Sequence, residues 1–358
     1  MFIIVAVTFI LGYILFYHIP IFDDKKSRLQ KNNLGSLSII VPARNEEHNL
    51  QYLLGSLAPY KDKLKEIIVV DDHSTDSTAK VAKNLGAKVI SLKSLPKGWF
   101  GKSFGCWSGA KSASGEIFLF LDADTMVEKN GLERLLRGFQ GRGEMITIQP
   151  YHKTEKFYES FSSFFHLVIM GSLGAFHPFS KWFPTKGAFG QAMLVSREDY
   201  FSWGGHESIQ GQIMENMAFG FKAFELGGRV RAYSGKGAIT MRMYPEGFFS
   251  LIQGWSKSFA SGAMNTNRMY LIIVSLWISG IMTFLLNIHT FSLPLGLFVY
   301  LLFVFQLGRI LLRVGNFKWH TSLLFPIMLL FFIFVFGYSC FRTFIKKNIT
   351  WKNRKIDM

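Results

Sequence analysis

The sequence predicts an α/β protein with a mostly parallel sheet, flanked at both ends by membrane-spanning helices. Short apolar runs alternate with helical patterns from residue 36 to residue 150, and long apolar segments occupy the two ends of the chain. Strands that alternate with helices at this spacing form parallel sheets with both faces covered. A mean hydropathy of +0.22 agrees with one globular domain joined to apolar segments.

Five apolar runs bounded by turn-forming residues predict the strands. They are SLSIIVP at 36–42, EIIVVDD at 66–72, AKVISL at 87–92, EIFLFLDAD at 116–124 and MITIQP at 145–150. Helical patterns connect the first four of these runs, at 45–57, 75–86 and 102–115, and Gly86 is placed to end the second helix. Ligands of such sheets collect at the carboxyl ends of the strands.

Acidic residues stand at two of these strand ends, Asp71 and Asp72 after one strand and Asp122 and Asp124 after another. In an extended chain Asp122 and Asp124 would point to the same side, so their charges require a cation or a turn. Such an Asp-x-Asp pair can hold Mg2+ or Mn2+ against a diphosphate, and Lys102 stands at a predicted helix start. The cation would be a Lewis acid for a leaving nucleotide. When the Asp-x-Asp motif is taken alone, the alternative interpretation is a solvated turn after a strand.

Two other nucleotide-binding motifs are disfavoured. The stretch GWFGKS at 98–103 contains Gly-Lys-Ser, but a P-loop requires a glycine where Pro96 stands. The turn after the first strand reads VPARNEE and carries no G-x-G-x-x-G, which disfavours a dinucleotide-binding fold.

Four apolar segments, at 2–16, 270–288, 291–308 and 321–341, are near the roughly 20 residues that a helix needs to cross a bilayer. They predict a membrane anchor at 1–20, a globular domain at 36–265, a transmembrane region at 269–342 and a basic cytoplasmic tail at 343–358. A cleaved signal peptide is the alternative for the first segment, but that segment lacks a basic start and a small-residue cleavage site.

Basic residues flank these segments, and they account for much of the net charge of +16: Lys25, Lys26, Arg28, Arg309, Arg313, Lys346, Lys347, Lys352, Arg354 and Lys355. This pattern favours anionic lipid over nucleic acid, and it places the globular domain on the cytoplasmic side of the cell membrane. Four crossings that start outside would leave the basic tail outside. One segment is therefore expected to be re-entrant or interfacial, and the segments of Pro294 and Pro326 are the candidates.

Cysteine usage agrees with a cytosolic domain. The chain has two cysteines, Cys106 and Cys340, and the second lies in an apolar segment. No disulfide framework is expected from this pattern.

Four separated motifs carry a family resemblance. The chain contains IIVPARNEE, VVDDHSTDST, GKSFGCWSGAKSASGEIFLFLDADT, and FGQAMLVSREDYFSWGGHESI followed by MEN. Their order and spacing resemble the family-2 glycosyltransferases with the GT-A fold, a Rossmann-like α/β fold, over about residues 36–260. The resemblance implies an inverting transfer of a sugar from a UDP-sugar donor.

The resemblance also implies a role for each matching residue. Pro42, Ala43 and Glu46 match the first nucleotide-binding segment, Asp72 matches the acidic contact to uridine, and Lys102 matches a residue near the donor diphosphate. Asp122 and Asp124 match the metal-binding Asp-x-Asp, in which Asp122 also faces the donor and Asp124 is the expected direct ligand of Mg2+ or Mn2+.

Glu215 matches the first position of the acidic pair that carries the catalytic base in the family. The second position departs from that pattern, because it is Asn216, and Glu207 is the alternative if the register is shifted. With an alcohol acceptor Glu215 would take the proton. A carboxylate acceptor is already ionised at neutral pH, so Glu215 would then only orient the acceptor or sugar. Gly204 and Gly205 predict a tight turn just before it.

The acceptor is expected to be lipophilic. YHKTEKFYESFSSFF, MYPEGFFSLIQGWSKSFASGA and TWKNR resemble the membrane-bound members of the family that glucosylate a C30 carotenoid carboxylic acid in staphylococcal-type pigment synthesis. That resemblance implies a carotenoid acid as acceptor, glucose as the sugar and other pigment-pathway enzymes as partners. Gln253, Trp255 and Lys257 are acceptor or interface candidates. They resemble the Gln-x-x-Arg-Trp motif of processive relatives only loosely, which disfavours polymerisation.

Aromatic residues are frequent next to the apolar segments. Phe248, Ile252, Trp255 and Phe259 share one helical face, which either packs on the domain core or lies at the bilayer surface. His152, His166 and His177 lack metal-ligand spacing and are expected to be packed or surface residues.

Two alternatives to the carotenoid acid remain open. The acceptor could be another membrane lipid, such as a diacylglycerol, a hopanoid or a polyprenyl phosphate. A non-catalytic nucleotide-sugar-binding subunit of a pathway is the second alternative, although Asp122, Asp124 and Glu215 are all present.

Overall fold

A computed structural model describes residues 1–23, 33–212, 214–264, 266–345, 350–351 and 354–355 of the chain. These residues form two compact units. One unit contains Pro20–Tyr151 and Thr185–Met241, and the other contains Met1–Ile19, His152–Pro184 and the chain from Arg242 onward. The expected basic residues Lys25, Lys26, Arg28, Lys346, Lys347 and Lys352 lie outside the described residues.

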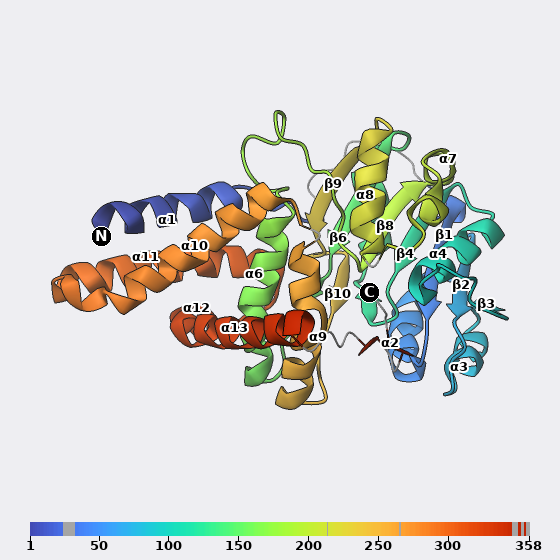
Figure 1. Cartoon of the computed structure of the whole chain (residues 1–358). Helices are drawn as coiled ribbons and strands as arrows, with labels where there is room; N and C mark the ends of the chain where they lie inside the picture. Colours follow the sequence, from blue (N-terminus) through green and yellow to red (C-terminus); the bar gives the residue numbers. More distant parts are fainter. Residues whose placement is uncertain (24–32, 213, 265, 346–349, 352–353, 356–358) are drawn as a thin grey trace. The chain divides into compact units, whose positions relative to one another are not determined.

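The first unit is built on a sheet that has seven strands among the described residues, in the order β3-β2-β1-β4-β8-β6-β9. The strands are β1 (Leu37–Ala43), β2 (Glu66–Asp71), β3 (Lys88–Ser91), β4 (Ile117–Leu121), β6 (Glu144–Gln149), β8 (Ala192–Ser196) and β9 (Arg229–Ser234). All pairs are parallel except the two that β8 makes with β4 and β6. The predicted α/β class with a mostly parallel sheet is confirmed (Figure 1).

Helices cover both faces of this sheet. They are α2 (Glu47–Leu57), α3 (Thr78–Asn84), α4 (Gly101–Ser112), α5 (Gly131–Gly138), α7 (Arg197–Ser202) and α8 (Glu215–Glu225). Alternate strand residues point to opposite faces, so Ile39 and Leu119 pack with α2, α3 and α5, whereas Ile40 and Phe118 pack with α4, α7 and α8. The short strands β5 (Thr125–Val127) and β10 (Ile239–Met241) pair antiparallel beside this core.

Glycines let α4 lie close to β1 and β2. A Cβ atom at Gly109 would stand 2.5 Å from Cγ2 of Ile40 and 3.1 Å from Cγ2 of Val70, and both partners are fully buried β-branched side chains. Because α4 carries Lys102 near its first turn, this close packing also sets the position of that lysine.

Gly109→Ala is expected to destabilise the protein by about 1–3 kcal/mol, because the added methyl group overpacks a core that cannot yield. Gly55→Ala is the matched control, since Gly55 is an exposed helical glycine with open space around it. That change is expected to stabilise by about 0.5–1 kcal/mol. Thermal unfolding of the detergent-solubilised full chain measures both variants, and equal unfolding midpoints would show that α4 has room to move.

The second unit contains the apolar helices. Its helices are α1 (Phe2–Leu15), α6 (Ser163–Ser172), α9 (Phe248–Met264), α10 (Arg268–Leu286), α11 (Leu293–Val314), α12 (Trp319–Leu323) and α13 (Phe325–Cys340). Helix α1 packs against α10 and α11, and α13 packs against α9 and α6 (Figure 1). Inside this unit the Gln306 amide donates to the carbonyl of Phe9 at 2.7 Å, which links α11 to α1.

Three helices in the described part of the chain are long and apolar enough to cross a membrane, at Arg268–Leu286, Leu293–Val314 and Phe325–Thr343. Helix α1 has 14 residues, fewer than the roughly 20 that a crossing needs. Pro294 and Pro326 stand in the first turns of α11 and α13, where proline does not interrupt a helix.

Candidate active site

The predicted nucleotide-binding residues meet at the carboxyl edge of β1 and β2. Ala43 pairs with Asp71 in the parallel register, and the backbone N–H of Asp72 donates to the carbonyl of Ala43 at 2.9 Å. Pro42 precedes Ala43 at the end of β1. The structure therefore brings Pro42, Ala43 and Asp72 together, as the strand pattern predicts.

The turn between β1 and α2 positions Glu46. Asn45 adopts a left-handed conformation with φ of 52°, which reverses the chain after the strand. The backbone N–H of Glu46 then donates to Thr78 Oγ1 at 2.8 Å, and its carboxylate accepts from Asn49 Nδ2 at 2.6 Å. Glu46 is thus held at the start of α2 beside the strand ends.

Asp72 is buried and held by two basic side chains. Its relative exposure is 3%, its Oδ1 lies 2.9 Å from His73 Nδ1, and its Oδ2 lies 3.8 Å from Arg44 Nη1. The same Arg44 nitrogen donates to the carbonyl of Asp72 at 2.8 Å. The carboxylate is therefore fixed in orientation before any ligand binds.

Asp122 and Asp124 lie on a turn. Strand β4 ends at Leu121, and Ala123 and Asp124 form a turn before β5, so the extended conformation does not persist through the motif. The N–H and hydroxyl of Thr125 both donate to the carbonyl of Asp122, at 3.1 and 2.7 Å, and stabilise this turn. Ala123 is buried while Asp124 is exposed. The turn carries the motif out of the core at the carboxyl edge of the sheet.

Lys102 connects the predicted donor and catalytic residues. Its Nζ lies 2.8 Å from Asp122 Oδ1, 3.1 Å from Glu215 Oε1 and 2.8 Å from the carbonyl of Gly190. The side chains of Lys102, Asp122 and Glu215 are 23%, 25% and 15% exposed, so the ion pairs are only partly screened by water. Although burial lowers the pKa of Lys102, the Asp122 and Glu215 carboxylates raise it above its ordinary value, and the lysine stays charged.

The cluster has an excess of negative charge. Burial raises the pKa of Asp122 to about 7 against the effect of Lys102, and the charges of Asp124 and Glu215 add to the rise. Lys102 faces the two carboxylates of Asp122 and Glu215, and a divalent cation beside Asp122 would add positive charge to this site. No group of three metal-ligating side chains occurs among the described residues. Mg2+ commonly binds through one or two carboxylates together with substrate phosphates, and the Asp122 and Asp124 pair suits that mode.

Helix α8 presents Glu215 and Asn216 in its first turn. Asn216 is 5% exposed, and its Nδ2 donates to the carbonyl of Gly190 at 2.5 Å. Lys102 donates to the same carbonyl, so the lysine and the asparagine share one backbone acceptor. Glu207 is exposed on the preceding turn. Gly204 and Gly205 have φ of 82° and 53°, which confirms the predicted tight turn.

Sequence reasoning missed a buried pair behind this helix. His206 is fully buried, its Nδ1 lies 2.8 Å from the Tyr200 hydroxyl, and it stacks on Phe219. Burial lowers the pKa of His206 to about 4, so the ring is neutral. In the sequence, a histidine among aromatic residues looks the same as an ordinary core residue. The available signal was the GGH stretch, in which His206 follows Gly204 and Gly205.

The acceptor candidates Gln253, Trp255 and Lys257 lie on α9, in the unit of apolar helices. Trp255 is buried, stacks on Phe165 with ring centroids 4.5 Å apart, and donates to Ser162 Oγ. Phe259 contacts Phe332, so the Trp255 and Phe259 face packs inside its own unit. Gln253 on the same helix is exposed. His152, His166 and His177 are packed residues of this unit.

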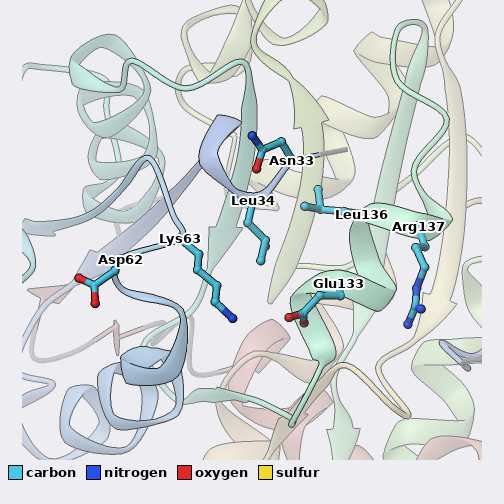
Figure 2. Close-up of a pocket in the computed structure, with 7 residues that line it drawn as sticks. All are labelled: Asn33, Leu34, Asp62, Lys63, Glu133, Leu136 and Arg137. Carbon is cyan, nitrogen blue, oxygen red and sulfur yellow. The ribbon is translucent and has the colours of Figure 1, made fainter. Parts of the chain in front are cut away.

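A cavity of about 490 Å³ lies at the other edge of the sheet (Figure 2). Its lining comes from segments that precede β1 and β2 and from α5: Asn33, Leu34, Asp62, Lys63, Glu133, Leu136 and Arg137. Since the candidate site stands at the carboxyl ends of the same strands, this cavity is separate from it.

Comparison with known proteins agrees with this arrangement. The profile of Glycosyl transferase family 2 matches residues 38–203. The 4,4'-diaponeurosporenoate glycosyltransferase of Staphylococcus aureus (strain bovine RF122 / ET3-1) is 33% identical over 363 residues, covering 99% of this chain and 96% of that relative. The chain belongs to glycosyl transferase family 2.

Two further proteins are similar to this family-2 glycosyltransferase. The enzyme of the same name from Staphylococcus aureus (strain MRSA252) is 34% identical over 340 residues, covering 92% of this chain and 90% of the relative. A mannosyltransferase from Pyrobaculum calidifontis, solved in complex with GDP-Man and Mn2+, matches with a TM-score of 0.54 and 13% identity over 97% of this chain and 96% of its own. That likeness shows the GT-A fold.

Proposed function

We propose that this glycosyltransferase moves glucose from UDP-glucose to the carboxylate of 4,4'-diaponeurosporenoate, in the biosynthesis of a carotenoid pigment. The identity to the Staphylococcus aureus enzymes of that name, which extends over nearly the whole of both chains, carries this proposal. The charge cluster of Lys102, Asp122 and Glu215 at the carboxyl edge of the sheet supports it, because transfer from a nucleotide sugar requires such a site.

The donor half of the site is assigned to the strand ends. Pro42, Ala43 and Glu46 would hold the nucleoside, and the fixed carboxylate of Asp72 would contact the uracil or ribose. Lys102 and Asp122 would lie beside the diphosphate and sugar. Asp122 and Asp124 would hold Mg2+ or Mn2+, which when bound supplies positive charge to the leaving diphosphate.

Inversion requires one displacement at the anomeric carbon. The acceptor oxygen forms a bond to that carbon as the bond to the UDP oxygen breaks, and the electron pair leaves with UDP. Glu215 is the candidate catalytic carboxylate because it is the acidic residue of α8 that reaches Lys102. For an alcohol acceptor it would take the proton, and for a carboxylate acceptor it would orient the reactants.

The unit of apolar helices is suited to a lipophilic acceptor. Its potential membrane helices expose large apolar side chains, among them Ile272, Leu276, Leu297, Phe298, Phe305 and Phe334. Lipid is the solvent that such surfaces require. We place the catalytic unit on the cytoplasmic side, since Arg309 and Arg313 near the end of α11 follow the positive-inside pattern. Other enzymes of the pigment pathway are proposed as partners.

Membranes that contain the full chain are expected to transfer label from UDP-glucose to 4,4'-diaponeurosporenoic acid in the presence of Mn2+. Diacylglycerol, hopanoid and polyprenyl phosphate are offered in parallel, and membranes without the chain are the control. Product from one of these lipids but not from the carotenoid acid would replace the proposed acceptor. UDP-glucose binding without any product would favour the alternative of a non-catalytic nucleotide-sugar-binding subunit.

A further inference from the structure

Ring contacts show which parts of the apolar helices lie at the same level. Helix α1 packs against α11, and Phe2 at the start of α1 contacts Phe291 just before α11, with ring centroids 4.8 Å apart. Phe9, in the middle of α1, contacts Phe303, in the middle of α11, at 5.7 Å. A helix rises about 1.5 Å per residue, so Phe303 is about 15 Å from either end of the 22-residue α11.

Helix α13 begins at this middle level. The ring of Phe325, its first residue, lies 6.4 Å from the ring of Phe303 and 5.1 Å from that of Tyr300. The Tyr300 hydroxyl also donates to the carbonyl of Leu323, just before α13. Figure 1 shows α13 starting partway along α11. A helix that crosses the bilayer beside α11 would instead start near one end of it.

The chain reaches this level from the end of α11. The backbone N–H of Asn316 donates to the carbonyl of His152 at 3.0 Å, and its side chain accepts from the N–H of Thr154 at 2.6 Å. Helix α12 then packs against α11, where a Cβ atom at Gly308 would lie 3.3 Å from Oγ of Ser322. The five residues of α12 therefore run back along the second half of α11 toward its middle.

Helix α13 returns to the level of α6 and α9. Phe332 contacts Phe165 of α6 at 5.0 Å and Phe259 of α9 at 5.9 Å. Just beyond α13, Arg342 Nη1 donates to Ser256 Oγ of α9 at 3.3 Å. The far end of α13 is therefore fixed to helices α6 and α9.

Helix α6 lies on the side where α11 ends. His166 of α6 contacts Phe317, three residues after α11, with ring centroids 6.4 Å apart. A Cβ atom at Gly171, near the end of α6, would lie 3.1 Å from Cγ2 of Val274 in the second turn of α10. The short connection at 287–292 joins the end of α10 to the start of α11, so α10 begins on the side where α11 ends (Figure 1).

The turn between α12 and α13 has its backbone groups paired, which a turn at bilayer depth requires. The N–H of Leu324 donates to the carbonyl of His320 at 2.8 Å, and the carbonyl of Leu324 accepts from the N–H of Ile327 at 3.0 Å. Pro326 has no N–H that could be left unpaired. Phe325 is 1% exposed. The turn is therefore suited to hydrocarbon.

We propose that α12 and α13 form a re-entrant hairpin, which enters and leaves the membrane on the side where α11 ends and contacts the acyl chains of that leaflet alone. The helix Phe325–Thr343 is long and apolar enough to cross a membrane, but its start beside the middle of α11 gives it about half of the roughly 30 Å hydrocarbon core. The exposed apolar side chains that meet these acyl chains are Ile327, Leu330, Ile333 and Phe334.

The distribution of charge supports the hairpin. The basic residues that follow α13 in the sequence are then cytoplasmic, on the same side as Arg309 and Arg313 near the end of α11. That arrangement obeys the positive-inside rule, whereas a fourth crossing would break it. The segment of Pro326 is thus the re-entrant one, and the segment of Pro294 crosses the membrane.

The first test measures the depth of the turn. A nitroxide label is attached to Ile327→Cys in the full chain, which also carries Cys106→Ala and Cys340→Ala, in vesicles of phosphatidylcholine and phosphatidylglycerol. Collisions with oxygen and with a water-soluble nickel chelate report its depth. A re-entrant α13 places the label about 15 Å below the headgroups, in the middle of the hydrocarbon core. A label at headgroup depth would overturn the hairpin, because a crossing helix starts there.

Two exposed positions of α11 calibrate this scale. Phe305→Cys lies in the middle of the helix, and Leu312→Cys lies near its end. Ile327→Cys is expected at the depth of Phe305→Cys and about 10 Å deeper than Leu312→Cys. The depth of Leu312→Cys at Ile327→Cys would contradict the proposal.

The second test keeps the native sequence. Green fluorescent protein and alkaline phosphatase are fused in turn to the C-terminus of the full chain in a bacterial host. The first fluoresces only in the cytoplasm, and the second is active only outside it. We expect fluorescence and a loss of phosphatase activity, and the reverse pattern would show that α13 crosses the membrane. Neither test involves a sugar donor or acceptor, so their outcome is separate from that of the transfer assay.

Discussion

Asp124→Ala is expected to lower sugar transfer about a thousandfold or more while the chain still inserts into the membrane. The proposed cation stabilises charge on the leaving diphosphate by several kcal/mol, and about 4 kcal/mol corresponds to about a thousandfold in rate. Asp124 lies exposed on the turn between β4 and β5, so its truncation creates no cavity in the core. Transfer is measured against Mn2+ concentration, and Mn2+ binding is measured separately by electron paramagnetic resonance.

The control for this variant is Asp62→Ala, which removes an exposed carboxylate from the opposite edge of the sheet. It is expected to leave both transfer and Mn2+ binding unchanged. Wild-type activity in Asp124→Ala would show that the assignment of the metal to this turn is wrong. Lost activity with unchanged Mn2+ binding would move the metal ligand from Asp124 to another residue.

Local signals were enough to predict the strands that carry the donor site. Strands β1, β2, β3, β4 and β6 are short apolar runs bounded by turn formers, and all five occur where the sequence predicts them. Their parallel order then places Asp72 and Asp122 at one edge of the sheet. This inference depends only on strand direction, because parallel strands share a carboxyl edge.

The antiparallel strand β8 could not be predicted in the same way. Its sequence AMLVS is apolar, but its place between β4 and β6 is set by pairing with strands that are distant in sequence. The contact between Lys102 and Glu215 also joins residues that are distant in sequence, since it connects the start of α4 to the start of α8. No periodicity in the sequence reports such a contact. The role of this contact is inferred from the three partners of Lys102 Nζ in the structure.

Lys102→Met is expected to lower kcat about 100-fold or more and to strengthen Mn2+ binding. Removal of a positive donor from a reacting site commonly costs about 10² to 10³ in kcat. The Lys102 ammonium group bonds both oxygens of Asp122, at 2.8 and 3.0 Å, so it competes with a cation for that carboxylate. Without the lysine the pKa of Asp122 rises further, so binding is measured at a pH that keeps Asp122 ionised. No ammonium group then competes for this carboxylate, and a divalent cation is attracted more strongly.

The opposite signs of these two effects distinguish a specific role from general damage. A misfolded site would lose both turnover and Mn2+ affinity. Loss of the lysine alone is expected to lower turnover and to raise Mn2+ affinity. Lys111→Met changes an exposed lysine of the same helix and is expected to alter neither quantity. If Lys102→Met weakens Mn2+ binding while Lys111→Met does not, the lysine helps to build the metal site instead of competing for it. Lys102 would then belong to the donor site through Asp122, and its bond to Glu215 would be secondary.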